Sequence, residues 1–527
     1  MSDSPIAASL RAPDRAPLQA RAPSAALDWR SPPVAALAIT LAFVVLRLIS
    51  ASFMGLGTDE SYSIAVARDL HASYFDHPPM HYWVAHAVEP LFGVSRMARV
   101  PFILLFGGSS WLMFVIARRL FGEAAGLWAV ISLNLSGFFT VAAGGWVLPD
   151  GPLIFFQLAA AAILAKLWFT KDSRTRQALP AWIAAGACIG LAALSKYQAA
   201  LFCGGLGLFL ITTDRGRKAL RTPGPYVAAV VVVAMLAPVL AWNWEHHWAS
   251  FAFQAGRGAP NRLNPLGPLV ALAGQFGLLL PWIFVPMAAA AISTGRIGPL
   301  AERRWLCLML GLPAIVIFTL APLIGAPTLP HWPMPGWVML FPLLGERLAL
   351  AAEIGAWPRR WAVASLLFVL CVGALGASDS ATGWLGSRFP KAFRHGDPTA
   401  ESIEWSQIRP ALAQAAVLRE PGAFIAALKW NEAGKIDQAA GDLAPVTVLS
   451  SDARQFGYRH PMAEFVGHDA LIVGKADTLS GRMADFAPYF RSLRPLPPLR
   501  IGRSDQGEIT IGLIEARGLL RPYGAVK

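Results

Sequence analysis

The 527-residue chain is 55% hydrophobic and only 15% charged, with a mean hydropathy of +0.48, and this excludes an ordinary soluble protein, because soluble domains carry roughly 25% charged residues. The formal net charge of +13 could favour nucleic acid as a partner, but the basic residues lie in short loops between apolar runs. They form no stripe with interleaved aromatic residues, so we predict a polytopic membrane protein that binds no nucleic acid.

The chain begins with a polar tail, residues 1–32, whose Ala, Pro, Ser and Arg content predicts a disordered cytoplasmic segment. Apolar runs long enough to cross about 30 Å of hydrocarbon follow it, at about 1.5 Å per residue. We predict about eleven transmembrane helices within 33–377, near residues 33–53, 98–117, 124–142, 152–170, 180–194, 198–213, 225–242, 266–292, 305–324, 334–350 and 361–377.

The distribution of basic residues predicts the orientation of these helices. Segments assigned to one side hold 19 Lys and Arg, and those assigned to the other side hold 6. Because basic loops stay in the cytoplasm, the N-terminus is predicted to be cytoplasmic. The loops 54–97 and 243–265 are then exported, and the expected location is the inner (plasma) membrane.

The composition changes after residue 377 to a charged and mixed sequence. Short apolar runs at 424–428, 446–449 and 470–473 read as strands, and helical patterns lie at 433–440 and 478–487. This alternation predicts a small exported α/β domain over residues 378–527.

Two acidic segments stand beside apolar runs in the predicted outer loops. Asp59 and Glu60 lie in Thr58-Asp59-Glu60-Ser61-Tyr62, and Asp150 follows Leu148-Pro149. A carboxylate beside hydrocarbon is costly to keep ionised, which favours a function for both Asp residues. The simpler interpretation is that each Asp caps the helix that follows it. Two acids on one side favour a shared pocket, in which a carboxylate with a raised pKa deprotonates a hydroxyl group.

The residues after Asp59 also predict a local structure. Ile64, Ala67 and Leu70 keep roughly helical spacing. We therefore expect an amphipathic helix that lies on the membrane surface, with Asp59 at its N-terminal end.

Basic and histidine side chains in the outer loops are candidates for holding an anionic substrate. Lys196 lies in a short turn between two predicted spans, and Arg257 lies in loop 243–265. Both can bind phosphate through charge-assisted hydrogen bonds, or they can simply reach lipid headgroups. His77 and His81 have a spacing that could bind zinc on a helix, but Pro78 and Pro79 oppose a helix there. We predict no metal site, and we assign His77 and His331 to hydrogen bonds with a substrate.

A family resemblance follows from these motifs. It is carried by Thr58-Asp59-Glu60-Ser61-Tyr62, Tyr74-Phe75-Asp76-His77-Pro78-Pro79-Met80-His81-Tyr82-Trp83, Arg99-Val100-Pro101, Leu148-Pro149-Asp150 and Leu194-Ser195-Lys196-Tyr197. Over about residues 35–350 the chain resembles the GT-C glycosyltransferases that use polyprenyl-phosphate sugars. Within that class it is most similar to glycosyltransferase family 39, which contains the lipid A aminoarabinose transferases and the protein O-mannosyltransferases.

The resemblance implies a role for each motif. Asp59 is the principal catalytic carboxylate, Glu60 supports the first loop and is grouped with the catalytic acids, and Asp150 is the second acid. Binding of the donor phosphate and sugar is assigned to Tyr62, Tyr74, Asp76 and His77.

Two departures from the resembling family concern charge. Aminoarabinose transferases carry Lys in place of His77 and Arg in place of Tyr62, so this chain has fewer fixed positive charges for the phosphate. Lys196, Arg257 or His331 are the candidates to supply the missing charge.

The predicted fold is a mainly α-helical polytopic GT-C-like protein with a small C-terminal α/β domain. The predicted activity is an inverting transfer of a sugar from a polyprenyl-phosphate carrier to a lipid A, glycan or protein acceptor on the exported side, with no cofactor or metal. A flippase for lipid-linked sugars is the alternative, because the many spans and an arginine within the first span, Arg47, suit a flippase equally. The long acidic first loop and the lack of repeated halves argue against the flippase. The sequence leaves the sugar and the acceptor open.

Overall fold

The computed structural model describes residues 31–92, 96–170, 178–393, 397–503 and 508–523. The predicted cytoplasmic tail, 1–32, falls almost wholly outside these residues. The chain forms two compact units. The helical unit comprises residues 1–48, 77–80 and 100–370, and the α/β unit comprises 49–76, 81–99 and 371–527. The division at residue 377, as predicted from composition, stays a prediction.

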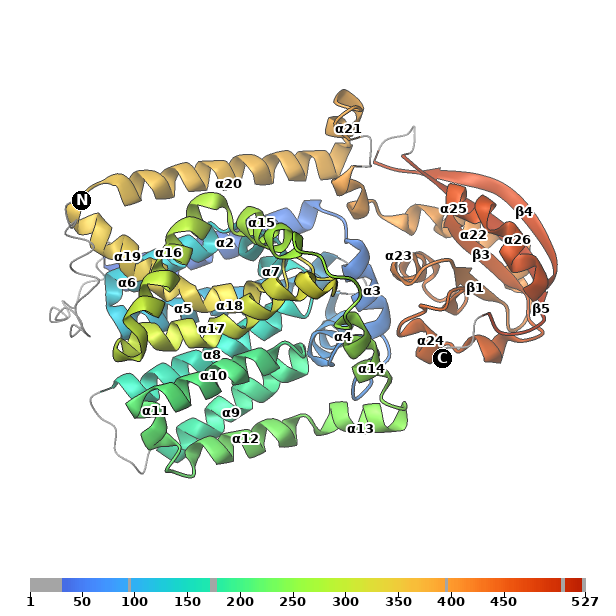
Figure 1. The fold of residues 1–527 in the computed structure, drawn as a ribbon. Coiled ribbons are helices and arrows are strands. Elements are labelled where there is room, and N and C mark those ends of the chain that lie inside the picture. The colour runs from blue at the N-terminus through green and yellow to red at the C-terminus, as the bar shows by residue number, and fades with distance from the viewer. Residues whose placement is uncertain (1–30, 93–95, 171–177, 394–396, 504–507, 524–527) are drawn as a thin grey trace. The chain divides into compact units, whose positions relative to one another are not determined.

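The helical unit is built from apolar helices that pack along their length. Helix α8 packs against α5 and α9, α10 packs against α17, and α19 packs against α6; Figure 1 shows these helices side by side. The elements that lie wholly or mostly in this unit are α2 (Pro32–Phe53), α5 (Val100–Phe121), α6 (Glu123–Asn134), α7 (Gly137–Gly145), α8 (Asp150–Phe169), α9 (Ala178–Ser195), α10 (Ala199–Thr212), α11 (Asp214–Ala219), α12 (Gly224–Met235), α13 (Ala237–Glu245), α14 (Ala249–Arg257), α15 (Gly267–Leu279), α16 (Pro281–Ile297), η3 (Gly298–Leu300), α17 (Glu302–Leu320), η4 (Ala321–Ile324), α18 (Met334–Trp337), η5 (Val338–Leu340), α19 (Phe341–Ile354) and α20 (Trp357–Thr382).

The predicted polytopic helical fold is confirmed. Among the described residues, six helices are long and apolar enough to cross a membrane, or up to eight if each bent pair counts as one span. The bent pairs are α6 with α7, at 77°, and α12 with α13, at 41°. Helices α9, α10 and α15 are apolar but shorter. Together these elements cover ten of the eleven predicted segments; the segment near 334–350 corresponds to α18, η5 and α19.

One segment predicted as a single span is interrupted in the structure. Residues 266–292 form two helices, α15 and α16, and not one. Leu280 separates them with a φ of 73°, and Pro281 follows it. Proline disfavours helical backbone in the residue before it, which explains a break at this position.

Arg47 supports the bend between α6 and α7. Its two terminal nitrogens donate to Asn134 Oδ1 at 3.1 Å, and its Nε donates to the carbonyl of Thr140 at 3.1 Å. Arg47 therefore faces protein, and its contacts here are structural.

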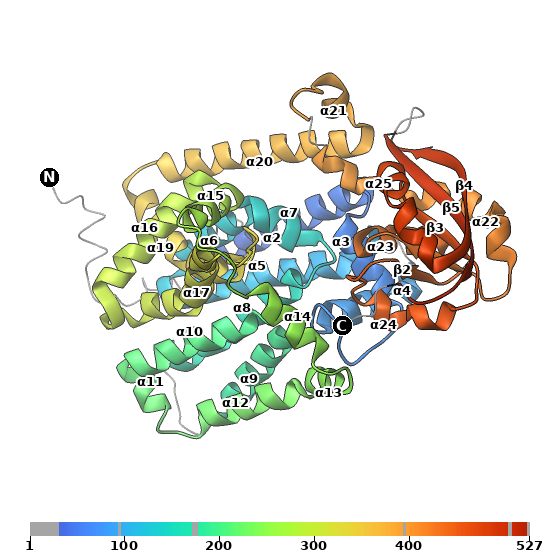
Figure 2. The same cartoon turned by 45° about the vertical axis from the view of Figure 1, so that its right-hand side comes forward.

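The α/β unit contains a mixed five-stranded sheet in the order β2-β1-β3-β5-β4. Strand β1 is parallel to β2 and β3, whereas β5 is antiparallel to β3 and β4. Helix α23 packs on β1 and β2 (Figure 2). The elements of this unit are α3 (Thr58–Ala67), α4 (Met80–Phe92), η1 (Arg96–Arg99), α21 (Trp384–Arg388), η6 (Pro398–Ser402), η7 (Trp405–Ile408), α22 (Arg409–Gln414), η8 (Ala416–Arg419), β1 (Phe424–Ala427), α23 (Trp430–Ala440), β2 (Val446–Val448), α24 (Phe456–Arg459), η9 (Met462–Phe465), β3 (Ala470–Lys475), α25 (Ala476–Gly481), α26 (Met483–Phe486), η10 (Ala487–Tyr489), β4 (Phe490–Ile501) and β5 (Ile509–Leu519).

The three strands predicted from the sequence match β1, β2 and β3, but the prediction missed β4 and β5. Strand β4 contains Pro495, Pro497 and Pro498 and shifts its register between Leu496 and Leu499. Proline removes a ladder donor, so it is tolerated mainly on edge strands and at bulges. Strand β4 is such an edge, because it pairs only with β5 among the described strands.

The helix predicted after Asp59 exists as α3, but it does not lie on a membrane surface. Its residues from Glu60 to Ala67 are all buried, and α3 packs closely against α23 of the same unit. The predicted amphipathic surface helix is therefore wrong, because α3 is covered on every face from its first turn onward.

Candidate active site

The best-defined polar contact of the helical unit joins Asp150 and Lys196. Asp150 begins α8, and Lys196 lies just after α9. Lys196 Nζ donates to both carboxylate oxygens of Asp150 at 3.0 Å, and both side chains are buried. The alternative in which Asp150 only caps its helix does not describe this geometry, since both carboxylate oxygens accept hydrogen bonds from Lys196.

Three further residues predicted for the site belong to the same unit as this pair: His77, Arg257 and His331. His77 and His331 lie within electrostatic range of Asp150. Burial lowers the pKa of His331 to about 4, with Lys196 and Arg257 also lowering it and Asp150 opposing them. His331 is therefore neutral at pH 7, so it can donate a hydrogen bond but supplies no fixed charge.

Arg257 ends α14 and is placed by aromatic rings. Its guanidinium lies 4.5 Å from the ring centroid of Trp332 and 5.6 Å from that of Phe253. Such cation–π contacts stabilise a guanidinium while leaving its N–H groups able to donate. Arg257 thus stays a candidate for phosphate binding.

Asp59 lies in the first turn of α3 in the α/β unit. Its side chain is exposed, and it has no hydrogen-bond or ion-pair partner among the residues that the structure describes. Partial desolvation by the surrounding protein raises the pKa of Asp59. The negative charges of Glu401, Asp76 and Glu60 raise this pKa further, whereas Arg454 lowers it. An accessible carboxylate with a raised pKa can accept a proton from a substrate.

Glu60, not Asp59, completes the N-terminus of α3. Glu60 Oε2 accepts a hydrogen bond from the Gly57 backbone N–H at 3.0 Å. Arg99 binds the same carboxylate through Nε at 2.8 Å and Nη2 at 2.5 Å. The interpretation of Asp59 as the helix cap is therefore wrong. The Glu60 carboxylate thus makes structural contacts with Gly57 and Arg99. Its predicted grouping with the catalytic acids stays a prediction.

Tyr62 and Asp76 form the centre of a buried network in the α/β unit. Tyr62 Oη donates to Asp76 Oδ1 at 3.2 Å, and Tyr82 Oη donates to the same oxygen at 2.9 Å. Tyr74 packs on Tyr82 with 4.1 Å between ring centroids. Its hydroxyl donates to the carbonyl of Asp69 at 3.0 Å, and burial raises its pKa to about 12. Tyr74 therefore stabilises this segment by bonding to the backbone of a residue five positions earlier in the chain.

Sequence reasoning missed the residues of the C-terminal region that complete this network. Gln455 donates its backbone N–H to Tyr62 Oη at 3.2 Å and accepts from the Phe75 backbone N–H at 2.8 Å. Arg454 Nη1 lies 3.4 Å from Asp76 Oδ2. Gln455 and Tyr62 are 393 residues apart, and no motif in Asp452-Ala453-Arg454-Gln455 signals the contact.

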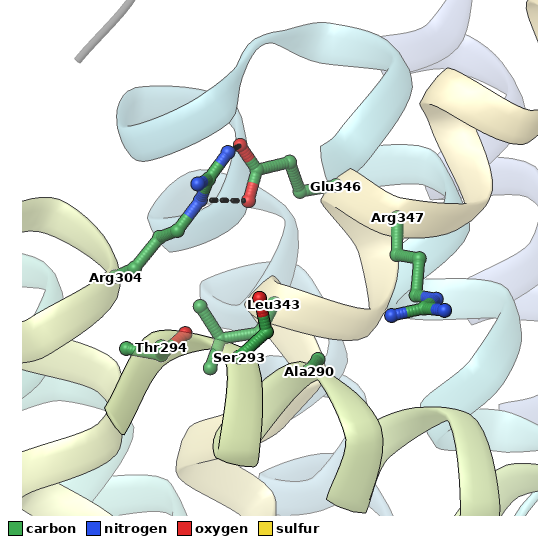
Figure 3. Close-up of a pocket in the computed structure, with 7 residues that line it drawn as sticks. All are labelled: Ala290, Ser293, Thr294, Arg304, Leu343, Glu346 and Arg347. Atoms are coloured by element: carbon green, nitrogen blue, oxygen red, sulfur yellow. Dashed lines mark hydrogen bonds and ion pairs between the residues drawn. The ribbon is translucent and has the colours of Figure 1, made fainter. Parts of the chain in front are cut away.

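A small pocket elsewhere in the helical unit is not part of these clusters (Figure 3). It is lined by Ala290, Ser293, Thr294, Arg304, Leu343, Glu346 and Arg347, and Arg304 and Glu346 form an ion pair across it at 2.8 Å. The neighbouring Arg303 donates to the carbonyl of Leu120, at the end of α5, where Arg119 binds Thr170. Thr170 follows the last turn of α8, about 30 Å along that helix from Asp150.

The structure thus gathers the predicted site residues into two sets, one in each unit. The helical unit holds His77, Asp150, Lys196, Arg257 and His331, whereas the α/β unit holds Asp59, Glu60, Tyr62, Tyr74 and Asp76. Within the first set Lys196 bonds to Asp150, and within the second set Tyr62 bonds to Asp76. The shared pocket of Asp59 and Asp150 stays a prediction.

Comparison with protein families matches residues 76–242 to the dolichyl-phosphate-mannose-protein mannosyltransferase model. The lipid A galacturonosyltransferase RgtD of Rhizobium johnstonii is 26% identical over 362 residues, which is 64% of this chain and 71% of RgtD. These relatives are named as transferases, so they give no support to the flippase alternative.

Solved structures share the fold of this chain. ArnT from Cupriavidus metallidurans bound to undecaprenyl phosphate superposes with a TM-score of 0.62 at 18% identity, covering 90% of this chain and 97% of ArnT. The oligosaccharyltransferase of Archaeoglobus fulgidus superposes with a TM-score of 0.51 at 13% identity, covering 91% of this chain and 72% of that protein. The fold predicted from the sequence is thereby confirmed.

Proposed function

We propose that this chain, a multi-pass membrane glycosyltransferase of the GT-C class, transfers a sugar from a polyprenyl-phosphate carrier to an acceptor of the cell envelope, with inversion at the anomeric carbon. The proposed acceptors are lipid A, an envelope glycan or a protein hydroxyl. RgtD is named for lipid A and ArnT for bound undecaprenyl phosphate, which supports a lipid-linked donor and a lipid acceptor. We place the reaction on the periplasmic side of the inner membrane, with the N-terminus in the cytoplasm.

The observation that carries the proposal is the environment of Asp59. Its carboxylate is accessible, has no bonded partner among the described residues, and has a raised pKa. These are the properties of a general base that removes a proton from a hydroxyl nucleophile. We assign Asp59 to remove the proton of the acceptor hydroxyl group while the oxygen of that hydroxyl attacks the anomeric carbon.

The donor phosphate leaves as an anion, so cationic and hydrogen-bonding groups should lower the barrier more than an acid would. Lys196 and Arg257 are assigned to bind this phosphate, and His77 and the neutral His331 are assigned to donate hydrogen bonds to it. The charge of Lys196 is balanced by Asp150, with which it forms an ion pair. We propose that no cofactor or metal takes part.

The direct test is transfer by the purified protein. We expect labelled product from a radiolabelled polyprenyl-phosphate sugar and a lipid A acceptor in detergent, without vesicles or a gradient. Absence of product with every donor and acceptor pair, together with gradient-dependent movement of the donor in vesicles, would instead favour the flippase. Mass spectrometry of envelope lipids and glycans with and without the protein identifies the sugar and the acceptor.

The role of Asp59 is tested by substitution. Asp59→Asn should lower the rate by about 10²–10⁴-fold, the range supplied by a general base, with unchanged expression and thermal unfolding. Asp442→Asn is the matched control, because Asp442 is an exposed carboxylate of the same unit that pairs only with Arg409 among the described residues. Near-wild-type transfer by Asp59→Asn would remove Asp59 from the mechanism.

A further inference from the structure

The Arg454-Gln455 dipeptide, just before α24, contacts the segment that carries the proposed catalytic base. Gln455 bonds to the Tyr62 hydroxyl and to the Phe75 backbone, and Arg454 lies 3.4 Å from the Asp76 carboxylate. The dipeptide therefore holds both Tyr62 and Asp76. All of these residues belong to the α/β unit.

Arg454 is itself held in a fixed conformation. Its guanidinium lies 4.4 Å from the ring centroid of Trp430, and its Nε donates to Asp452 Oδ1 at 2.9 Å. Trp430 in turn meets Tyr62 edge-on, with 5.0 Å between ring centroids. The backbone of Arg454 has a φ of 51°, in the left-handed region that residues other than glycine seldom adopt. A strained residue held on several sides is a recurrent feature of functional sites.

The charges that act on Asp59 come from two elements and two loops of the unit. Glu401 lies in η6, Asp76 lies between α3 and α4, Glu60 lies in α3, and Arg454 precedes α24. Arg99 already pairs with Glu60. Arg454 is the positive charge whose field opposes the negative charges at Asp59.

We propose that Arg454 is a positioning residue of the glycosyl transfer reaction. Arg454 holds Asp76 beside Tyr62, which Gln455 binds, and supplies the positive charge that faces the catalytic base Asp59. The inference rests on the proposed function, because it assumes that Asp59 acts as the base. It gives the C-terminal α/β region a part in the chemistry. It also provides the acidic cluster with a cation that is distinct from Lys196, Arg257 and His331 of the helical unit.

The proposal predicts a change in the pH profile of transfer. A base works only when it is deprotonated, so the rate falls on the acid side of its pKa. Arg454 lowers the pKa of Asp59, and its loss should therefore move the acid limb of kcat/KM to higher pH. At a fixed acidic pH the rate of the Arg454→Gln variant should therefore fall below that of the wild type, and the two rates should converge at high pH.

The experiment compares four variants in the purified full chain, with transfer rates measured from pH 4.5 to 8.5. Arg454→Gln should move the acid limb to higher pH, and Arg454→Lys should largely restore its position because the charge is kept. Glu401→Gln removes a negative charge near Asp59 and should move the limb to lower pH. Arg459→Gln is the matched control: Arg459 pairs with Asp69 and Asp437, and it is not among the groups that act on Asp59.

An acid limb that stays in place in Arg454→Gln, or that moves equally in Arg459→Gln, would overturn the proposal. Thermal unfolding of each variant identifies loss of the folded state, and Arg454→Lys keeps the test valid if Arg454→Gln unfolds. The failure of the proposed function is distinguishable, since Asp59→Asn would then retain transfer whatever the Arg454 variants do.

Discussion

The two units hold their principal acids in opposite ways. Asp150 of the helical unit is buried and is held by the ammonium group of Lys196 through two 3.0 Å hydrogen bonds. Asp59 of the α/β unit is exposed, and no described residue bonds to it. The cation that acts on it, Arg454, binds its neighbour Asp76.

This difference indicates which of the two carboxylates can accept a proton. A carboxylate bound to an ammonium group holds its negative charge and is a poor proton acceptor, whereas a carboxylate among other negative charges gains from taking up a proton. The proposed role of Asp150 is therefore to hold Lys196, and Asp59 is the acid proposed for proton transfer.

The largest effect is expected from the removal of Lys196, the partner of the buried acid Asp150. Lys196→Ala leaves Asp150 buried without compensation, which should lower the free energy of unfolding by about 3–5 kcal/mol and raise the KM for the donor. Denaturation in detergent and donor titrations measure the two effects.

The control for this substitution removes both charges. The double variant Asp150→Asn/Lys196→Ala should recover part of the lost stability, since no uncompensated charge remains, but it should not recover donor affinity. If Lys196→Ala unfolds like the wild type and keeps its donor KM, the pair is neither a stabilising contact nor part of the donor site.

A smaller effect is expected where α23 meets α3 in the α/β unit. A Cβ atom at Gly434 would lie 2.4 Å from the Tyr62 backbone nitrogen and 2.6 Å from its Cα. Gly434→Ala should therefore displace α3 and destabilise the protein by about 1–3 kcal/mol, with a loss of transfer. Gly481→Ala is the control, because open space surrounds that position. Equal stability of both variants would show that α3 moves freely against α23.

The smallest effect concerns the pH dependence of stability from His331. Its folded pKa of about 4 lies below the ordinary value of 6.5, so the unfolded chain binds more protons between these pH values. Stability should therefore fall as the pH is lowered from 6.5 towards 4, by roughly 1 kcal/mol at pH 5.5. His331→Gln should lose this dependence and keep its stability at pH 7. Parallel stability curves for both proteins would mean that His331 is not desolvated.

The sequence predicted the parts of the fold that local patterns control. Apolar runs predicted the transmembrane helices, and strands β1, β2 and β3 were predicted from short apolar runs. The break at Leu280 was missed although Pro281 signals it locally, because the apolar run continues through both helices. The proline-rich strand β4 was missed because its pairing with the partner strand β5 decides it.

The candidate site was predictable only in part, for the same reason. Family motifs identified Asp59, Asp150 and Lys196. The structure added Arg454 and Gln455, which lie 378 and 393 residues from their partners Asp76 and Tyr62. Contacts at such separations leave no local pattern in one sequence. The role of Glu60 as the residue that completes α3 also depended on seeing Arg99 beside it.

The α/β unit is assembled from stretches that are far apart in the chain, and this has a consequence for biosynthesis. Residues 49–76 emerge from the ribosome long before 371–527 are made, and the helices of 100–370 come between them. The segment 49–76, which carries Asp59, therefore contacts Arg454, Gln455 and α23 only after the last quarter of the chain has been made. A polypeptide interrupted after residue 370 would carry Asp59 without its surroundings, so an unfinished chain in the membrane should be unable to transfer sugar.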